Sequence, residues 1–92
     1  MSGQAMATVQ IETERFRVIR YDLEPGDRIP WHRHEYDYVA VPLTDGAVEI
    51  RTAEGSSAQR MTAGTPYARS AGAEHELVNG SEPYSFVEVE RF

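Results

Sequence analysis

The chain contains no cysteine among its 92 residues. This absence excludes disulfide bonds, thiolate metal sites and a cysteine nucleophile. Any transition-metal site must therefore be built from histidine, aspartate, glutamate or tyrosine. The length indicates a single domain, and a domain of this size buries only roughly 60–65% of the surface that its unfolded chain exposes. A bound metal or a second chain would therefore add useful stability.

The sequence also has little positive charge and no long apolar run. Its formal net charge is -6, from 9 basic and 15 acidic residues, so we expect no nucleic-acid partner that binds by phosphate neutralisation. No apolar stretch approaches the ~20 residues of a membrane span, so we expect no membrane partner. The first residues, "MSGQAMATVQ", lack the basic start and apolar core of a signal peptide. We therefore expect a cytoplasmic location.

A helical pattern is missing as well, since no window of about 12 residues carries an apolar stripe. Short alternating or β-branched segments stand in its place, the clearest at residues 16–23, 38–43, 47–51 and 84–92. Tight-turn signals separate them, the strongest being Asp45-Gly46 and Asn79-Gly80. This pattern predicts an all-β sandwich or barrel. We expect residues 1–7 to be a flexible lead-in and residues 8–92 to form the domain.

Alternation within these segments also predicts which side chains point inward. In residues 84–92 it places Phe86 and Glu88 on one face, and Val87 and Val89 on the other. Six apolar residues are candidates for the core: Val41, Val48, Ile50, Leu77, Phe86 and Val89.

Two of the three histidines, His32 and His34, are one residue apart. In a strand, residues i and i+2 lie on one face, about 6.6 Å apart. Two imidazoles can converge from that separation on one metal ion. A polar hairpin with two surface histidines would give the same pattern, so the pair alone leaves both interpretations open.

Glycines and the third histidine recur at fixed distances around this pair. One stretch reads Pro25-Gly26, five residues, His32-Arg33-His34; another reads Gly64, five residues, Ser70-Ala71-Gly72, two residues, His75, three residues, Asn79. The spacing resembles the two cupin motifs, P-G-x5-H-x-H-x3/4-E-x6-G and G-x5-P-x-G-x2-H-x3-N. The resemblance covers residues 25–79, and "HRHEYDYVAVPLTDG" is similar to small bacterial cupins of catabolism such as the β-alanine-degradation cupins.

The resemblance to a small single-domain cupin implies a fold and a site. The implied fold is a jelly-roll barrel of six to eight antiparallel strands, in which the motif glycines occupy turns that need positive φ. The implied site is a divalent transition metal held by His32, His34 and His75, with iron, manganese, nickel and zinc as candidates. Many cupins are homodimers, so we expect a homodimer here too.

The sequence departs from the cupin pattern at two positions. Ser70 replaces the proline of the second motif, a loss that the turn should tolerate. Tyr38 stands where the first motif has glutamate, because the interval from His34 to Gly46 is one residue longer than the pattern. Asp37 should face away from Tyr38, and Glu35 should be solvated at a hairpin tip, so we expect neither carboxylate to bind the metal.

A site without a carboxylate leaves the metal's positive charge uncompensated and several coordination positions open. A buried charge needs a partner, so we expect an anionic small-molecule ligand such as a carboxylate or enolate. The leading interpretation is a metalloenzyme of the dioxygenase type. A non-catalytic module that binds metal and ligand, and a purely structural cupin, are the alternatives.

Two further residues are candidates for catalysis. Tyr38 could bind the metal as a phenolate, donate a hydrogen bond near it, or only pack. Arg69 could clamp a substrate carboxylate through its bidentate guanidinium, or it could be an ordinary surface residue. Trp31 precedes His32 and should therefore face away from the metal side.

Overall fold

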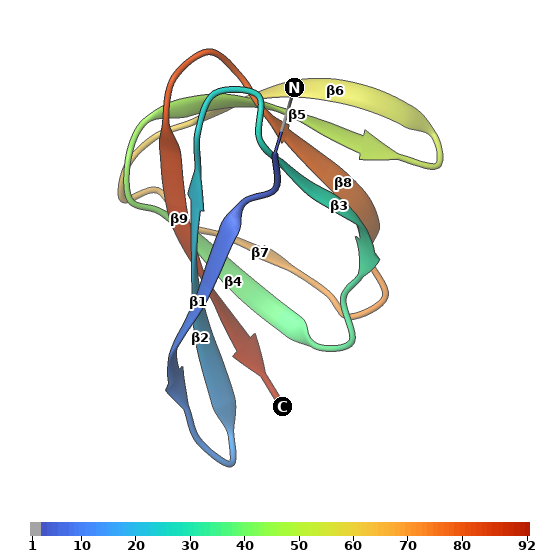
Figure 1. Ribbon diagram of the computed structural model, residues 1–92. Helices are drawn as coiled ribbons and strands as arrows, with labels where there is room; N and C mark the ends of the chain where they lie inside the picture. The colour runs from blue at the N-terminus through green and yellow to red at the C-terminus, as the bar shows by residue number, and fades with distance from the viewer. Residues whose placement is uncertain (1–2) are drawn as a thin grey trace.

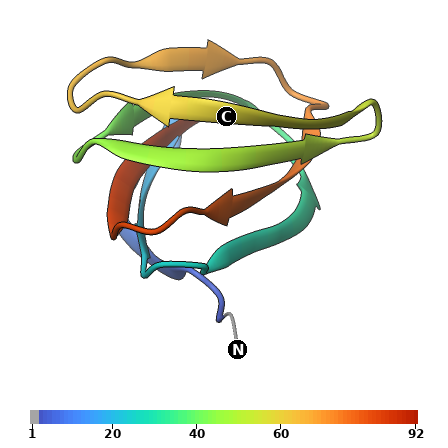
Figure 2. The same ribbon diagram turned by 90° about the horizontal axis from the view of Figure 1, so that it is seen from above.

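The computed structural model describes residues 3–92, which form nine β-strands and no helix (Figure 1). The five-stranded sheet contains, in spatial order, β1 (Met6–Glu12), β2 (Phe16–Leu23), β9 (Tyr84–Arg91), β4 (Asp37–Pro42) and β7 (Tyr67–Arg69). The four-stranded sheet contains β3 (Arg28–Arg33), β8 (Glu74–Asn79), β5 (Gly46–Thr52) and β6 (Gly55–Met61). The strands of each sheet pair antiparallel, and the two sheets surround a common interior (Figure 2). The predicted all-β jelly roll is confirmed, with one strand more than the resemblance implies.

The core lies between the sheets and follows strand alternation. In β9 the buried residues are Tyr84, Phe86, Glu88 and Glu90, and the residues between them are half-buried. The buried apolar cluster consists of Leu23, Tyr38, Ala40, Val48, Leu77, Tyr84 and Phe86. The core prediction is thus confirmed for Val48, Leu77 and Phe86, and Ile50 packs against the cluster. It is wrong for Val41 and Val89, because these half-buried residues lie on the outer faces of β4 and β9, opposite Ala40 and Phe86 respectively.

Three glycines of the motifs occupy turns with left-handed backbone. Their φ values are 77° at Gly26, 79° at Gly64 and 95° at Gly72. A side chain disfavours this region because its Cβ approaches the carbonyl oxygen. The expected requirement for positive φ is therefore confirmed at all three positions.

Asn79, the last residue of the second motif, joins two chain reversals. Its buried Nδ2 donates hydrogen bonds to the carbonyl oxygens of Leu23, Glu24 and Glu82, at 3.4, 3.0 and 2.8 Å. The first two carbonyls belong to the end of β2 and the turn after it, and the third belongs to the turn between β8 and β9. The side chain of Asn79 therefore has a structural role at the end of the barrel away from the histidines.

The ordered structure begins before the expected boundary at residue 8. Strand β1 starts at Met6, and the amide of Ala5 donates a hydrogen bond to the carbonyl of Arg28 at 2.9 Å. Residues 1 and 2 of the expected lead-in lie outside the described residues. No helix within residues 3–92 is long and apolar enough to cross a membrane.

Candidate metal centre

Two of the three histidines lie on neighbouring strands of the four-stranded sheet, and the third directly follows one of these strands. His32 on β3 is the register partner of His75 on β8, so their side chains start from directly opposed positions. His34 follows the last residue of β3. Its amide donates to the carbonyl of Ala73 at 2.9 Å, and its carbonyl accepts from the amide of Gly72 at 2.8 Å. These two hydrogen bonds fix His34 against the turn that leads into β8.

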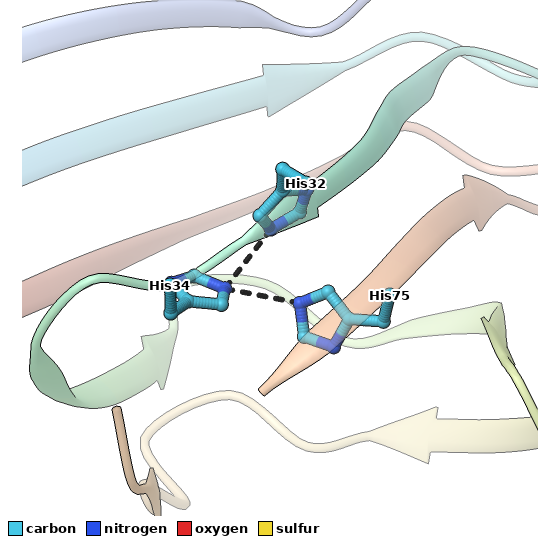
Figure 3. A group of neighbouring side chains, drawn as sticks. All are labelled: His32, His34 and His75. Atoms are coloured by element: carbon cyan, nitrogen blue, oxygen red, sulfur yellow. Dashed lines mark hydrogen bonds between the residues drawn. The ribbon is translucent and has the colours of Figure 1, made fainter. Parts of the chain in front are cut away.

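The imidazole rings converge on a single point (Figure 3). The Nε2 atom of His34 lies 2.9 Å from Nε2 of His32 and 3.0 Å from Nε2 of His75. Metal–nitrogen bonds are near 2.0–2.1 Å, so nitrogen atoms about 3 Å apart can share one ion. The Nδ1 of His32 lies 2.8 Å from the carbonyl oxygen of Pro30. A hydrogen bond from Nδ1–H to that carbonyl leaves the lone pair of Nε2 available for a metal.

Burial keeps two of these imidazoles neutral. Burial is the largest cause that lowers the pKa of His34 to about 4, and the neighbouring His32 and His75 lower it further. Burial likewise lowers the pKa of His75 to about 4, with contributions from His32 and Arg69. Metal ligation requires the neutral imidazole. The residues present therefore fit a divalent metal in both geometry and protonation.

Tyr38, at the position of the motif glutamate, packs against a histidine. Its ring stacks on the ring of His34 with centroids 4.0 Å apart and an interplanar angle of 25°. The side chain is buried, and burial is the main cause that raises the pKa of the Tyr38 hydroxyl. Tyr38 thus helps to fix the orientation of the His34 ring.

Glu35 and Asp37, the carboxylates that follow His34 in the sequence, are not part of the histidine cluster. Within the described residues, the group that could hold a metal here consists of His32, His34 and His75 alone. Glu35 and Asp37 are exposed. Asp37 accepts a hydrogen bond from the amide of Ala71 at 2.8 Å, which ties the end of the hairpin to the following turn.

A cavity of about 720 Å³ opens beside the histidines. His32, His75 and Tyr38 line it, together with Tyr67 and Arg69. Apolar side chains form another part of the wall: Ile29, Ile50, Met61, Leu77 and Phe86. A volume of this order is typical of small-molecule sites, which combine apolar walls with a few polar groups.

Arg69 is an exposed residue that lines this cavity. Its guanidinium carbon lies 5.0 Å from the centroid of the Tyr67 ring, and its Nη1 donates to the carbonyl of Ala68 at 3.0 Å. Within residues 3–92 its remaining N–H groups form no hydrogen bond, and because the side chain lines the cavity these groups can meet a ligand. Trp31 is half exposed, which agrees with its expected outward orientation.

Glu88 is the site residue that sequence reasoning missed. It lies on the inner face of β9, is only 6% exposed, and lines the same cavity as His32 and His75. It also lines a second cavity, of about 500 Å³, with His32 and His34. Burial, and then the neighbouring Glu90, raises the pKa of Glu88 to about 7. The sequence contains the signal, because strand alternation in residues 84–92 places Glu88 on the same face as Phe86.

No family model matches the chain. A cupin domain from Bordetella pertussis has a crystal structure that superposes with a TM-score of 0.97 and is 41% identical in sequence, over 100% of this chain and 97% of that chain. The chain belongs to the cupin family. This small cupin is also 43% identical to the β-alanine degradation protein BauB of Pseudomonas aeruginosa, over 98% of each chain. A double-stranded β-helix protein from Klebsiella pneumoniae is 26% identical, with a TM-score of 0.80, over 97% of this chain and 77% of that one.

Proposed function

We propose that this cupin holds a divalent transition metal and uses it to bind, and to transform, a small anionic metabolite. The observation that carries the proposal is the convergence of three Nε2 atoms beside a cavity, with no carboxylate in the ligand group of the described residues. A carboxylate or enolate would supply the negative charge that the protein ligands lack.

His32, His34 and His75 would hold the metal. Imidazole nitrogen suits iron, nickel and zinc, and the ligand set does not choose among these and manganese. When bound, the metal supplies a Lewis-acid centre and, where it is redox-active, electron-transfer chemistry. A dioxygenase-type oxidoreductase is the reaction class that we propose.

The other cavity residues would bind and orient the ligand. Arg69 offers N–H groups at the cavity wall that can pair with a carboxylate in a bidentate arrangement. Tyr38 keeps His34 in position through ring stacking. The apolar wall formed by residues such as Leu77 and Phe86 would exclude water from the bound ligand.

The relative from Pseudomonas aeruginosa supports a catabolic role. That relative is named a β-alanine degradation protein, and the two chains match over nearly their whole lengths. We therefore propose that the ligand is a small carboxylate derived from amino-acid breakdown. A cytoplasmic location remains the prediction that goes with such a role.

Ligand titration and oxygen uptake test the proposal together. Protein loaded anaerobically with Fe(II) is titrated with β-alanine, its keto-acid derivatives and simple diketones, and the absorption spectrum is followed before oxygen is admitted. We expect a carboxylate-dependent spectral change and oxygen consumption with at least one compound. Arg69→Ala should weaken carboxylate binding by about tenfold or more, the cost of losing a charge-assisted hydrogen bond.

Each other outcome has a defined meaning. Ligand binding without oxygen consumption would assign the protein to the non-catalytic binding modules and remove the enzymatic part of the proposal. Indifference of the metal spectrum to every carboxylate would remove the proposed ligand class.

A further inference from the structure

Glu88 differs from the other buried glutamate of β9 in lacking a partner. Glu90 forms an ion pair with Arg17, at 2.9 Å between the carboxylate Oε1 and Nε. Within residues 3–92, no side chain or backbone group forms a hydrogen bond or ion pair with the Glu88 carboxyl. Glu88 is nevertheless 6% exposed, compared with 7% for Glu90.

A buried carboxylate without a partner is unfavourable, because the protein replaces its hydration with nothing. The raised pKa of Glu88, about 7, is the expected consequence. Such a side chain does not stabilise the fold by itself. Since Glu88 lines the cavity beside His32 and His75, a partner can reach it from a bound ligand.

The surroundings of Glu88 indicate the charge of that partner. Tyr38 of β4 and Tyr67 of β7 line the larger cavity together with Glu88, and Tyr21 of β2 lines the second cavity together with Glu88. Aromatic faces attract cations. A buried carboxylate that shares its cavity walls with aromatic rings favours a ligand group that is positive and donates hydrogen bonds, and an ammonium group has both properties.

We propose that Glu88 binds the ammonium group of a ligand whose carboxylate is held at the histidine and Arg69 end of the cavity. The ligand class is then a short zwitterionic amino acid with its two charged groups at opposite ends. This inference rests on the proposed function, because the proposed function places the ligand's carboxylate at the metal site and Arg69. Glu88 itself touches the ligand and sets its specificity.

Paired ligands provide the test. Each pair contains an ω-amino acid and the fatty acid of the same chain length: β-alanine with propionate, and γ-aminobutyrate with butyrate. Binding to zinc-loaded protein is measured by calorimetry at pH 8, where Glu88 is ionised. We expect at least one amino acid to bind roughly 10- to 100-fold more tightly than its partner, the range of a hydrogen bond between charged groups.

The variants separate Glu88 from other charges. Glu88→Gln keeps the side-chain shape and should abolish the preference for the amino acid while leaving fatty-acid binding unchanged. Glu54→Gln is the matched control, because Glu54 is an exposed carboxylate that lines the same cavity and accepts a hydrogen bond from Thr52. It should retain the preference. In the native protein the preference should also weaken as the pH falls from 8 to 6, because Glu88 becomes protonated.

The results that would contradict the inference differ from the result that would contradict the proposed function. Equal binding of both members of each pair, or a preference that persists in Glu88→Gln, would overturn the inference while leaving the proposed function intact. A Glu88→Gln protein that loses its bound zinc would also overturn it, since Glu88 would then act at the metal. Failure of every carboxylate to bind would count against the proposed function itself. The inference would then fail too, because it depends on the proposed position of the ligand's carboxylate.

Discussion

His34 shows how a buried position prepares a metal ligand. Only 7% of the residue is exposed, and burial holds its pKa at about 4. The imidazole is therefore neutral at physiological pH, and a metal does not have to displace a proton from it. The stacked ring of Tyr38 and the two backbone hydrogen bonds to Gly72 and Ala73 fix its position. At this residue, local packing determines both orientation and protonation.

Glu88 predicts a pH dependence of stability in the metal-free protein. Its pKa is raised from 4.5 to about 7 in the folded state. Folding therefore favours the protonated form. Ionisation of Glu88 does not lower the free energy of unfolding below pH 4.5, lowers it increasingly between pH 4.5 and 7, and lowers it by a constant amount above pH 7. The full cost is about 3 kcal/mol. The charged and titratable residues that share a cavity with Glu88 are Arg17, Tyr21, His32, Arg33, His34, Glu35, Tyr38, Glu54, Arg60, Tyr67, Arg69, Glu74, His75 and Glu90.

Glu88→Gln removes this ionisation and should therefore stabilise the protein selectively at high pH. Urea unfolding of the metal-free native and variant proteins at pH 5 and pH 8 measures the effect. We expect nearly equal free energies of unfolding at pH 5 and a more stable variant at pH 8. A stability difference that does not change between the two pH values would contradict the raised pKa.

Part of the candidate site could be predicted from the sequence. The set His32, His34 and His75 was implied by the resemblance to the cupin motifs, and the structure brings the three side chains together. The stacking of Tyr38 on His34 did not follow, since it depends on the path of the chain between β3 and β4. Glu88 was overlooked because alternation predicts the face on which a residue lies, whereas a charged residue on that face is usually expected to be solvated.

Turn chemistry explains why the element boundaries were predicted well. The segment expected at residues 16–23 is β2, Phe16–Leu23, and the segment expected at 47–51 lies within β5. Strand β1 begins at Met6, two residues before the predicted start of the domain, and the hydrogen bonds that join residues 3 and 5 to residues 27 and 28 leave no pattern in the sequence. Strand order within the sheets likewise depends on long-range pairing.

Substitution of Gly64 tests whether its turn requires a residue that tolerates positive φ. A Cβ at this position would meet nothing within 4 Å, so the cost of Gly64→Ala comes from its φ of 79° alone. We expect destabilisation by about 1 kcal/mol, measured as the shift in the free energy of urea unfolding. Gly64→Asn is the control, and it should cost less because asparagine tolerates the left-handed region. An alanine variant as stable as the native protein would contradict a strained turn.

At the scale of the whole molecule, one edge of the five-stranded sheet is unprotected. All seven residues of β1 are exposed, and Met6, Val9 and Ile11 are apolar with exposed fractions of 67%, 56% and 49%. An exposed apolar edge strand promotes association. A second copy of the chain would cover the edge in both protomers through one symmetric contact.

We therefore expect a homodimer that uses β1. Light scattering coupled to size-exclusion chromatography should give twice the mass of one chain. Val9→Glu should shift the mass to that of one chain, whereas Gln10→Glu, a charge placed on the adjacent exposed position of the same strand, should shift it less. A native protein that remains a monomer over a wide concentration range would remove this prediction.

The three-histidine site is the claim on which the functional account depends. Its most direct test is elemental analysis of protein purified without a polyhistidine tag. The account predicts close to one equivalent of a divalent transition metal per chain, and its loss in His34→Ala with the fold retained in circular dichroism. A native protein that contains no stoichiometric metal and binds none on addition of iron, manganese, nickel or zinc would contradict it.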